Sequence, residues 1–359
     1  MKNENKVAII GTVGVPACYG GFESLAENLL PLPSPTRVYC SSSAYAEHAD
    51  QFRGADLTYI PLAANGVSSI PYDILSVLHA VIKRTDVLLI LGVSGSTILP
   101  FVRLFSPKTR IVCNIDGLEW RRAKWGKWAS RFLKLCEKIA VKYSHEIIAD
   151  NQAIQEYVAQ EYGVSAHLIA YGGDHAVGGK SQEADTPADS PYAFALCRIE
   201  PENNVHLIIE GCAQAQVPLK FIGNWNNSDY GRTLRERYSN HKLIELIDPI
   251  YDINTLYRYR ANCSLYLHGH SAGGTNPSLV EMMHFGKPIL AFDCDYNRAS
   301  TENQALFFTD ADTLASLLSQ DPSVTSERGE ALKKIAQERY TWSAVKRDYE
   351  SLIYQKSDN

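Results

Sequence analysis

Short apolar runs alternate with helical patterns along almost the whole chain, and this alternation constrains the fold more than any other feature of the sequence. One series of runs ends near residue 170 and a second begins near residue 193. Between them, residues 177–190 are polar and lack a hydrophobic period, which is typical of a linker. Strands that alternate with helices form a parallel sheet with both faces covered. We therefore expect an α/β protein with two doubly wound, Rossmann-like domains.

The runs also predict where each element lies. The expected strands of the first series are Val7–Ile10, Arg37–Tyr39, Leu57–Ile60, Val87–Leu91, Arg110–Asn114, Glu146–Ala149 and His167–Ala170. Those of the second series are Ala193–Cys197, Lys220–Ile222, Leu243–Leu246, Cys263–His268, Pro288–Phe292 and Leu306–Phe308. The predicted boundaries are 1–176 for the first domain, 177–190 for the linker, 191–335 for the second domain, and 336–359 for a C-terminal helix that packs back on the first domain. Since such sheets bind ligands beyond the carboxyl ends of their strands, we expect a central cleft that both domains face.

Composition excludes several classes of protein. A net charge of −5 argues against a partner made of nucleic acid. The eight cysteines show neither a C-x-x-C pair nor zinc spacing, which favours reduced thiols in a cytosolic protein. The longest apolar region, 87–104, is interrupted by glycine, proline and arginine, so it does not predict a membrane span. Asp293 and Asp295 form a D-x-D pair, but two carboxylates alone do not define a Mg²⁺ site, and we expect no metal or other cofactor.

One motif in the second domain carries most of the functional signal. The strand that ends at His268 runs into a loop rich in small residues, Gly269–Thr275. Asn276 then offers a helix N-cap, and Pro277 occupies the first helical position. Backbone amides at such a turn, with the positive end of the helix, favour an anion. Glu281 follows with a carboxylate that accepts hydrogen bonds from hydroxyl groups, so the motif predicts a sugar-nucleotide site.

Two other loops of the second domain add to this site. Arg198 follows the first strand of the domain and has the guanidinium geometry that holds a diphosphate bidentately. Tyr251 precedes a helix, where it either lines a nucleobase pocket or is an ordinary loop tyrosine. The predicted donor-binding residues are Arg198, Asn203, Tyr251, His270, Gly274, Thr275, Asn276 and Glu281.

The first domain carries polar residues at the ends of several expected strands. Its first turn, residues 11–23, is not G-x-G-x-x-G, so the dinucleotide-binding fingerprint is missing. Gly20, Gly21 and Glu23 are predicted to form a loop that approaches a phosphate or the acceptor, with a plain tight turn as the alternative. The predicted catalytic residues are Asp116, Asp150 and Tyr171. Asp116 either orients sugar hydroxyls or belongs to a solvated Asp-Gly turn.

Residues 120–134 combine three tryptophans with six basic residues in an otherwise acidic chain. Tryptophan favours the membrane interface, and each basic residue adds attraction to anionic lipid. The segment therefore predicts contact with a membrane surface or with a lipid-linked phosphate, and the alternative is tryptophans packed in the core. The residues predicted to make this contact are Arg121, Arg122, Lys124, Trp125, Lys127 and Trp128.

With these motifs, the chain resembles a retaining glycosyltransferase of family 4 with the GT-B fold. The resemblance covers essentially the whole chain. Two motifs of the first domain, P-A-x-Y-G-G-F-E at Pro16–Glu23 and N-I-D-G-L-E-W at Asn114–Trp120, resemble the subgroup with bacterial polysaccharide rhamnosyltransferases. In the second domain, G-G-T-N-P-S-L-V-E and R-I-E-P-E-N point to the same subgroup.

This resemblance implies transfer of a hexosyl unit, with L-rhamnose from dTDP-L-rhamnose as the first choice. The acceptor would be a saccharide on undecaprenyl diphosphate, used in bacterial surface polysaccharide synthesis at the inner face of the cell membrane. The chain departs from the family at two positions: Gly273 stands where the first of two glutamates is usual, and Asn203 stands where a basic residue is common. A donor that is a UDP- or GDP-sugar, a noncatalytic nucleotide-sugar-binding protein and a nicotinamide-dependent oxidoreductase are the alternatives.

Overall fold

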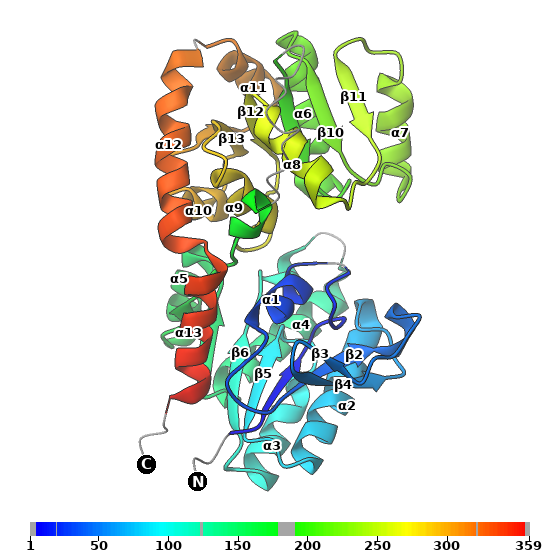
Figure 1. Ribbon diagram of the computed structural model, residues 1–359, viewed down its shortest axis with the longest axis vertical. Coiled ribbons are helices and arrows are strands. Elements are labelled where there is room, and N and C mark those ends of the chain that lie inside the picture. Colours follow the sequence, from blue (N-terminus) through cyan, green and yellow to red (C-terminus); the bar gives the residue numbers. More distant parts are fainter. Residues whose placement is uncertain (1–4, 19, 123–124, 179–190, 321, 356–359) are drawn as a thin grey trace. The chain divides into compact units, whose positions relative to one another are not determined.

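The structure, a computed structural model, describes residues 5–18, 20–122, 125–178, 191–320 and 322–355. It divides into two compact units (Figure 1), of which unit 1 is Met1–Tyr171 with Trp342–Asn359 and unit 2 is Gly172–Thr341. The chain leaves unit 1 after Tyr171, earlier than the predicted end at residue 176, and re-enters it at Trp342, later than the predicted 336. Most of the predicted linker, residues 179–190, lies outside the described residues.

Unit 1 is built on an eight-stranded sheet in the order β3-β4-β2-β1-β5-β6-β7-β8. All its described pairings are parallel except the short β3–β4 hairpin. Its strands are β1 (Val7–Ile10), β2 (Thr36–Ser41), β3 (Gln51–Phe52), β4 (Ala55–Ile60), β5 (Val87–Leu91), β6 (Arg110–Asn114), β7 (Glu146–Ala149) and β8 (His167–Leu168). Every residue of β1, β5 and β6 is buried, as expected for central strands covered on both faces.

Six α-helices described in unit 1 cover this sheet. They are α1 (Gly21–Leu29), α2 (Ser69–Ile82), α3 (Leu99–Phe105), α4 (Lys127–Tyr143), α5 (Gln152–Tyr162) and α13 (Trp342–Tyr354). From β4 the chain crosses back to β5 and continues in the same direction to β8, so right-handed crossovers place α2 to α5 on one face of the sheet. The crossover from β1 to β2 runs the other way, so α1 lies on the opposite face, where it packs with α13.

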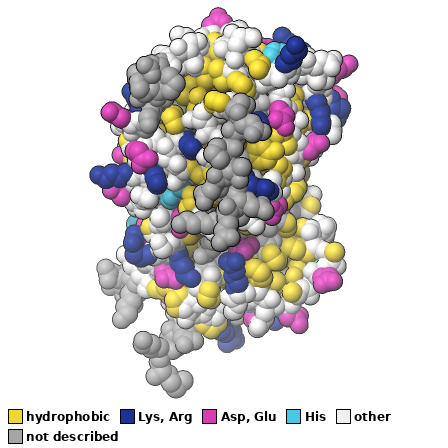
Figure 2. All heavy atoms as spheres, turned by 45° about the horizontal axis from the view of Figure 1, so that its top comes forward, with side chains coloured by type: hydrophobic (Ala, Val, Ile, Leu, Met, Phe, Trp, Pro, Cys, Tyr) yellow, Lys and Arg dark blue, Asp and Glu magenta, His cyan; other side chains and the backbone are white. Residues whose placement is uncertain are grey.

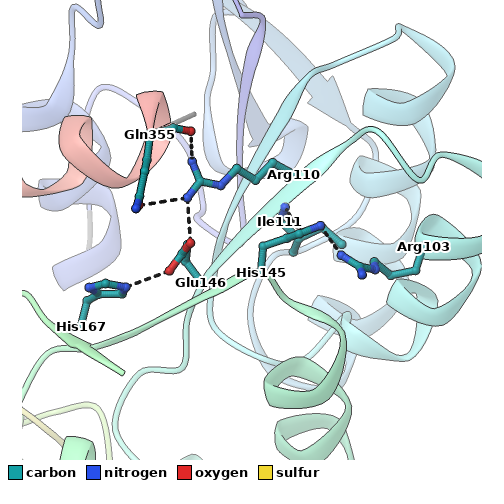
Figure 3. A network of polar contacts seen from close by, with 7 residues as sticks. All are labelled: Arg103, Arg110, Ile111, His145, Glu146, His167 and Gln355. Atoms are coloured by element: carbon teal, nitrogen blue, oxygen red, sulfur yellow. Dashed lines mark hydrogen bonds and ion pairs between the residues drawn. The ribbon is translucent and has the colours of Figure 1, made fainter. Parts of the chain in front are cut away.

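The C-terminal helix α13 is fixed to unit 1 along its length. Tyr349 accepts a hydrogen bond from the Asn114 side chain at 2.8 Å, at the carboxyl end of β6. At the opposite end of β6, where the strand begins, Arg110 donates to the Gln355 carbonyl at 2.6 Å and to Glu146 at 2.8 Å (Figure 3). His167 pairs with the second oxygen of Glu146 at 2.8 Å. The starts of β6, β7 and β8 are thereby joined to the residue that follows α13.

Unit 2 is a six-stranded parallel sheet in the order β11-β10-β9-β12-β13-β14. The strands are β9 (Ala193–Leu196), β10 (Leu219–Ile222), β11 (Ile244–Ile247), β12 (Leu265–His268), β13 (Ile289–Phe292) and β14 (Leu306–Phe308). The helices are α6 (Val205–Gln214), α7 (Asp229–Tyr238), α8 (Ile253–Asn262), α9 (Pro277–Met283), α10 (Asp295–Ser300), α11 (Ala311–Leu318) and α12 (Pro322–Arg339). Large side chains such as Trp225, Phe221 and Phe308 fill the core.

Contacts near Tyr340 explain why the units divide where they do. The C-terminal helix was predicted over 336–359, but α12 ends at Arg339 and α13 begins at Trp342. The Tyr340 carbonyl accepts from the Gly173 amide at 2.8 Å and from His284 at 2.9 Å, all within unit 2. A Cβ on Gly173 would lie 2.7 Å from the Glu281 backbone nitrogen, so this glycine packs directly on α9. Residues 172–178 therefore belong to unit 2 rather than to the first domain.

Candidate active site

The long first loop of unit 1 is held by Glu23, one of the predicted loop residues. Its carboxylate accepts from the Val13 amide at 2.7 Å and from the Thr12 hydroxyl at 3.1 Å, and the residue is 6% exposed. Burial raises the pKa of Glu23, and these hydrogen bonds only partly oppose it. Gly20 precedes α1 with φ of +102°, and a Cβ there would lie 2.5 Å from a Glu23 oxygen. In this structure the Glu23 carboxylate fixes the conformation of the loop through hydrogen bonds, Gly20 ends the loop and Gly21 begins α1.

The three predicted catalytic residues of unit 1 lie near one another. Asp116 follows β6 in a left-handed conformation, φ 60°, and its amide donates to the Asn114 side chain at 3.0 Å. Asp150 follows β7 and is 2% exposed. Burial raises the pKa of Tyr171 well above its ordinary value, and the negative charges of Asp116 and Asp150 raise it further. The Tyr171 hydroxyl is thus held neutral beside two carboxylates, which suits it to donating a hydrogen bond.

Two helical residues that the sequence did not predict lie near the carboxyl ends of strands in unit 1. Tyr349 of α13 is fully buried, and its pKa is raised by burial and by the charges of Asp150 and Asp116. Asp73 of α2 is 3% exposed and contacts Ser94, in the loop after β5. Burial raises the pKa of Asp73 to about 7. Asp73 and Tyr349 both lie within helices and not in a loop that follows a strand, so the sequence pattern did not indicate them.

In unit 2, the loops after β9 and β12 are joined to each other. Ser271 donates through its amide and hydroxyl to the Glu202 carbonyl at 3.1 and 2.7 Å, and Asn204 donates to the Gly269 carbonyl at 2.9 Å. Asn203 is 2% exposed and donates its amide to the Arg198 carbonyl at 2.7 Å, while the Arg198 residue itself is exposed. The structure therefore brings the Arg198 loop beside the His270 loop and gives Asn203 a framework role within it.

The turn that starts α9 has the predicted local geometry. Asn276 caps the helix by accepting from the Ser278 amide at 3.0 Å, and Pro277 is the first helical residue. Gly273 has φ of +113° with open space where a Cβ would be, and Thr275 is 4% exposed. Because α9 has seven residues, its dipole is short, and a role of the Gly274 and Thr275 backbone amides in binding an anion stays a prediction.

Glu281 has partners that the sequence did not predict. Arg260 of α8 hydrogen-bonds one of its oxygens, and His175 Nε2 lies 3.3 Å from the other. Burial alone would raise the pKa of Glu281, but Arg260 and His175 outweigh it and hold that pKa below its usual value. The carboxylate is ionised, fixed in place and still has lone pairs for a hydroxyl group. His175 lies in a short helical turn, Asp174–Val177, at the end of a segment that the sequence assigned to the other domain.

His175 also lines an open depression of about 540 Å³ together with Tyr251. The remaining lining residues are Gly178, Asp252, Ile253 and Asn254. Tyr251 is 81% exposed, so its ring is accessible to a planar ligand. Asp252 caps α8 by accepting from the Thr255 amide at 2.8 Å. The structure thus connects Tyr251 to Glu281 through His175, within unit 2.

Two stacked histidines lie at the end of β12. The rings of His268 and His270 are parallel within 15°, with centroids 4.5 Å apart. His268 is 1% exposed, and within the described part of the chain neither of its ring nitrogens has a hydrogen-bond partner. Burial lowers the pKa of His268 to about 3, so its ring is neutral. The His270 carbonyl accepts from Asn297 at 2.8 Å, which joins this loop to the start of α10.

The tryptophan-rich segment divides between internal contacts and the surface. The Trp120 indole donates to Glu137 at 2.9 Å, and the Arg121 guanidinium lies 5.0 Å from the centre of the Trp120 ring. Arg122 and Trp125 both contact Glu119, at 3.2 and 3.1 Å. Lys127 and Trp128 are exposed, and Lys124 lies outside the described residues. Of the predicted membrane-contact residues that the structure describes, Arg121, Lys127 and Trp128 are exposed, and Arg122 and Trp125 are partly buried.

The described residues contain neither a membrane-spanning helix nor a cluster of metal ligands. None of their helices combines the length and apolarity needed to cross a membrane. No group of three or more histidine, cysteine, aspartate or glutamate residues among them is placed to hold a metal ion. Asp293 of the D-x-D pair is bonded to Arg298 at 2.6 and 2.8 Å.

Comparison with known proteins adds information on the fold. A family described as a domain of unknown function (DUF1972) matches residues 4–174. No curated protein matches the chain. Among solved structures, sucrose-phosphate synthase from Thermosynechococcus elongatus aligns with a TM-score of 0.75 at 15% identity, over 97% of this chain and 98% of the other. HepE from Anabaena in complex with UDP aligns with a TM-score of 0.75 at 16% identity, over 97% and 99%.

A third structure, a glycosyltransferase from Rickettsia africae, aligns with a TM-score of 0.72 at 13% identity, over 99% of this chain and 100% of the other. These neighbours and the two parallel sheets confirm the predicted fold class, which is GT-B. At such identities the likeness establishes the fold and leaves the reaction to be argued from the residues.

Proposed function

We propose that this protein is a retaining glycosyltransferase that moves a hexosyl unit from a nucleotide sugar to a lipid-linked saccharide. The observation that carries the proposal is the GT-B fold over nearly the full chain, with polar residues gathered at the carboxyl ends of the strands of each unit. The preferred donor is dTDP-L-rhamnose. The preferred acceptor is a saccharide on undecaprenyl diphosphate, at the inner face of a bacterial membrane where surface polysaccharide is made.

Unit 2 supplies the donor side of this proposal. HepE, one of the structural neighbours, is seen with UDP and with UDP-glucose. In this chain, Tyr251 would cover a nucleobase in the depression that His175 lines. Glu281, ionised and held by Arg260, would accept from the 3′-hydroxyl of the deoxyribose. Arg198 and the amides of Gly274 and Thr275 would bind the diphosphate, since charge-assisted donors are strong phosphate ligands.

The reaction needs stabilisation of charge on the departing diphosphate. As the glycosidic bond lengthens, negative charge grows on the phosphate oxygens, and fixed donors lower the barrier most when they are arranged beforehand. Retention means that the acceptor attacks the face from which the diphosphate leaves, so a phosphate oxygen can take the acceptor proton. Asp116, Asp150 and the neutral hydroxyl of Tyr171 would then orient sugar hydroxyl groups and form no covalent intermediate.

Two alternatives follow from specific observations. The neighbour HepE is seen with UDP-glucose, which favours a UDP-sugar as the second choice of donor. Gly273 has no side chain, and nothing lies within 4 Å of where its Cβ would be. This position therefore offers the donor hexose no contact of the kind that a glutamate would make. A protein that binds a nucleotide sugar without transferring it is the alternative that this position supports.

A transfer assay tests the proposal. Lipid-linked saccharides extracted from bacterial membranes are incubated with the protein and with dTDP-rhamnose, UDP-glucose or a GDP-sugar, and nucleoside diphosphate release is measured. We expect release that depends on both donor and acceptor, and a fall of at least about 100-fold in Asp150→Asn and Asp116→Asn. Asp56→Asn, which changes an exposed carboxylate of unit 1, is the matched control. Normal turnover in both site variants would remove these residues from the reaction, and donor binding without any transfer would favour the noncatalytic alternative.

A further inference from the structure

Helices α2, α3 and α4 of unit 1 expose an unusual amount of apolar side chain. Of the eleven large hydrophobic residues that are exposed in the described chain, eight lie on these three helices. Two lie on α4 and three each on α2 and α3. Phe105 is 76% exposed, Trp128 is 82% exposed and Ile82 is 75% exposed. Scattered exposed apolar residues are ordinary, but a group on neighbouring elements marks an interaction surface.

The exposed residues repeat with the period of a helix, on the side away from the core. On α4 the outward positions are 128, 131, 135, 138 and 142, and on α2 they are 75, 78 and 82. The core-facing stripe of α4 is separate and includes Leu133, Cys136 and Ala140. Spacings of three and four place the outward residues on one stripe of each helix. These helices therefore have an apolar stripe toward the sheet and a second, mixed stripe toward solvent.

The three helices form one layer. They lie on the same face of the sheet, as the crossovers require. α3 packs against α4, and the helical turn Ser96–Ile98 that leads into α3 contacts both α2 and α4. Their outward stripes are therefore neighbours on one face of unit 1, which we call the α2–α4 face.

The charges on the α2–α4 face have a single sign. The exposed charged residues of α4 are Lys127, Arg131, Lys138 and Lys142, and Arg103 is exposed on α3. The two acidic residues that the three helices contain are buried, Asp73 at 3% and Glu137 at 1% exposure. On the face shown in Figure 2, basic and acidic side chains are interspersed. A basic, apolar layer is an exception in a chain with net charge −5.

We propose that the α2–α4 face docks on an anionic lipid bilayer. Phe101, Leu104, Phe105, Trp128 and Leu135 would enter the interface between headgroups and acyl chains, while Arg131 and its neighbours contact anionic headgroups. The Arg131 guanidinium lies over the Trp128 ring, 5.5 Å from its centre, so the cation and the interfacial aromatic residue are already side by side. Amphipathic helices with lysine, arginine and bulky apolar residues bind membranes in this way.

This inference rests on the proposed function for its biological purpose, since a lipid-linked acceptor lies in a membrane. It relocates the membrane contact that the sequence predicted. Arg122 and Trp125 are engaged with Glu119, whereas Phe101, Leu104 and Phe105 of α3 lie outside the predicted segment altogether. Charge complementarity favours lipid over a protein partner, because the face offers cations and apolar side chains without carboxylates.

Vesicle sedimentation of the full chain tests the proposal. The probes are vesicles of phosphatidylcholine with and without phosphatidylglycerol. We expect binding to the anionic vesicles that weakens as salt is added. Arg131→Gln with Lys138→Gln should lower the partition coefficient about 30-fold. Leu104→Gln with Phe105→Gln should lower it at least about tenfold. All four side chains are outward, so these changes spare the core.

The matched control is Lys242→Gln with Lys334→Gln, which removes the same charge from exposed positions of unit 2 and should leave partitioning unchanged. Nucleotide-sugar binding in solution is measured on each variant in parallel, and it should stay at the wild-type level. Equal sedimentation of wild type and both α2–α4 variants would overturn the proposal, as would failure of the wild type to bind anionic vesicles. Dimerisation that the α2–α4 substitutions abolish, without vesicle binding, would assign the face to a second copy. Loss of the proposed function would instead show as absent nucleotide-sugar binding with intact vesicle binding.

Discussion

Arg260 on α8 donates a hydrogen bond to Glu281 on α9, and the side chains are 7% and 13% exposed. The pair holds the carboxylate ionised next to His175, which lines the depression together with Tyr251. The Arg260 Nε has no hydrogen-bond partner within the described residues, so the guanidinium is committed to Glu281 through its terminal nitrogen. A residue chosen from the sequence for contact with a ligand is therefore also part of the internal structure of unit 2.

Removing Arg260 should be costly. Arg260→Leu leaves a buried carboxylate without its cation, and we expect the free energy of unfolding to fall by about 3–5 kcal/mol. Arg235→Leu is the control, because Arg235 pairs with Asp248 at the surface, where such pairs contribute about 1 kcal/mol or less. Urea titration measures both changes. Equal, small effects of the two substitutions would show that the Arg260–Glu281 pair does not support unit 2.

The contact between α13 and β6 gives a second prediction. Tyr349→Phe removes the hydroxyl that accepts from the buried Asn114 amide, so we expect a loss of about 1–3 kcal/mol in the free energy of unfolding. Tyr354→Phe is matched in chemistry, but its hydroxyl contacts Ser34 where the surface is partly open to water. That variant should lose under about 1 kcal/mol. The same urea titration decides, and a larger loss in Tyr354→Phe would contradict this account of how α13 is held.

The buried ring of His268 predicts a dependence of stability on pH. Its pKa in the folded protein is about 3, below the ordinary value of 6.5, so below pH 6.5 the unfolded chain binds a proton that the folded chain does not. Its contribution is present above pH 6.5 and is lost as the pH falls toward 3, by about 1.4 kcal/mol per pH unit. The wild type should therefore lose stability faster than His268→Phe between pH 6.5 and 4.5. Parallel curves for wild type, His268→Phe and His268→Gln would show that this histidine is not held neutral.

The buried carboxyl group of Asp73 predicts the opposite dependence, a stability that falls as the pH rises. Burial raises its pKa from 3.8 to about 7, so the folded protein keeps a proton that the unfolded chain releases. Its contribution to stability is full below pH 3.8 and declines as the pH rises to 7, by about 1.4 kcal/mol per unit. Asp73→Asn, which cannot titrate, should remove that decline and leave a curve that rises more steeply with pH than the wild type. Chemical denaturation at a series of pH values measures it, and a wild-type slope retained by the variant would refute the assignment.

The sequence predicted the regular elements well because central strands of a parallel sheet are continuous apolar runs. Val87–Leu91 and Arg110–Asn114 have the expected bounds, and both strands are wholly buried. The two-residue strand β3 was missed because it is too short to show a period. The break at Tyr340 was missed because it depends on tertiary hydrogen bonds from Gly173 and His284 rather than on a local helix-breaking residue.

Part of the candidate site could be predicted from the position of polar residues at strand ends. Asp116, Asp150 and Tyr171 were chosen on that basis; the structure places them close enough for the two charges to act on the Tyr171 hydroxyl, and their catalytic role stays a prediction. His175, Arg260 and Tyr349 were not predicted, because each reaches the site from an element that is distant in sequence from the motif it completes. The role of Asn203 as a framework residue was also hidden, since a buried amide and a ligand-binding amide look alike in a sequence.

Binding of nucleotide sugars tests the central claim most directly. The protein is heated with dTDP, dTDP-rhamnose, UDP-glucose, a GDP-sugar or NAD⁺, and the shift of its thermal unfolding is recorded, with His175→Ala and Glu281→Gln in parallel. A ligand at 100 times its Kd should stabilise the folded state by about 2.7 kcal/mol. We predict a shift with dTDP and dTDP-rhamnose that both variants reduce, and none with NAD⁺. A shift with UDP-glucose alone would change the donor, and no shift with any nucleotide sugar would contradict the glycosyltransferase assignment itself.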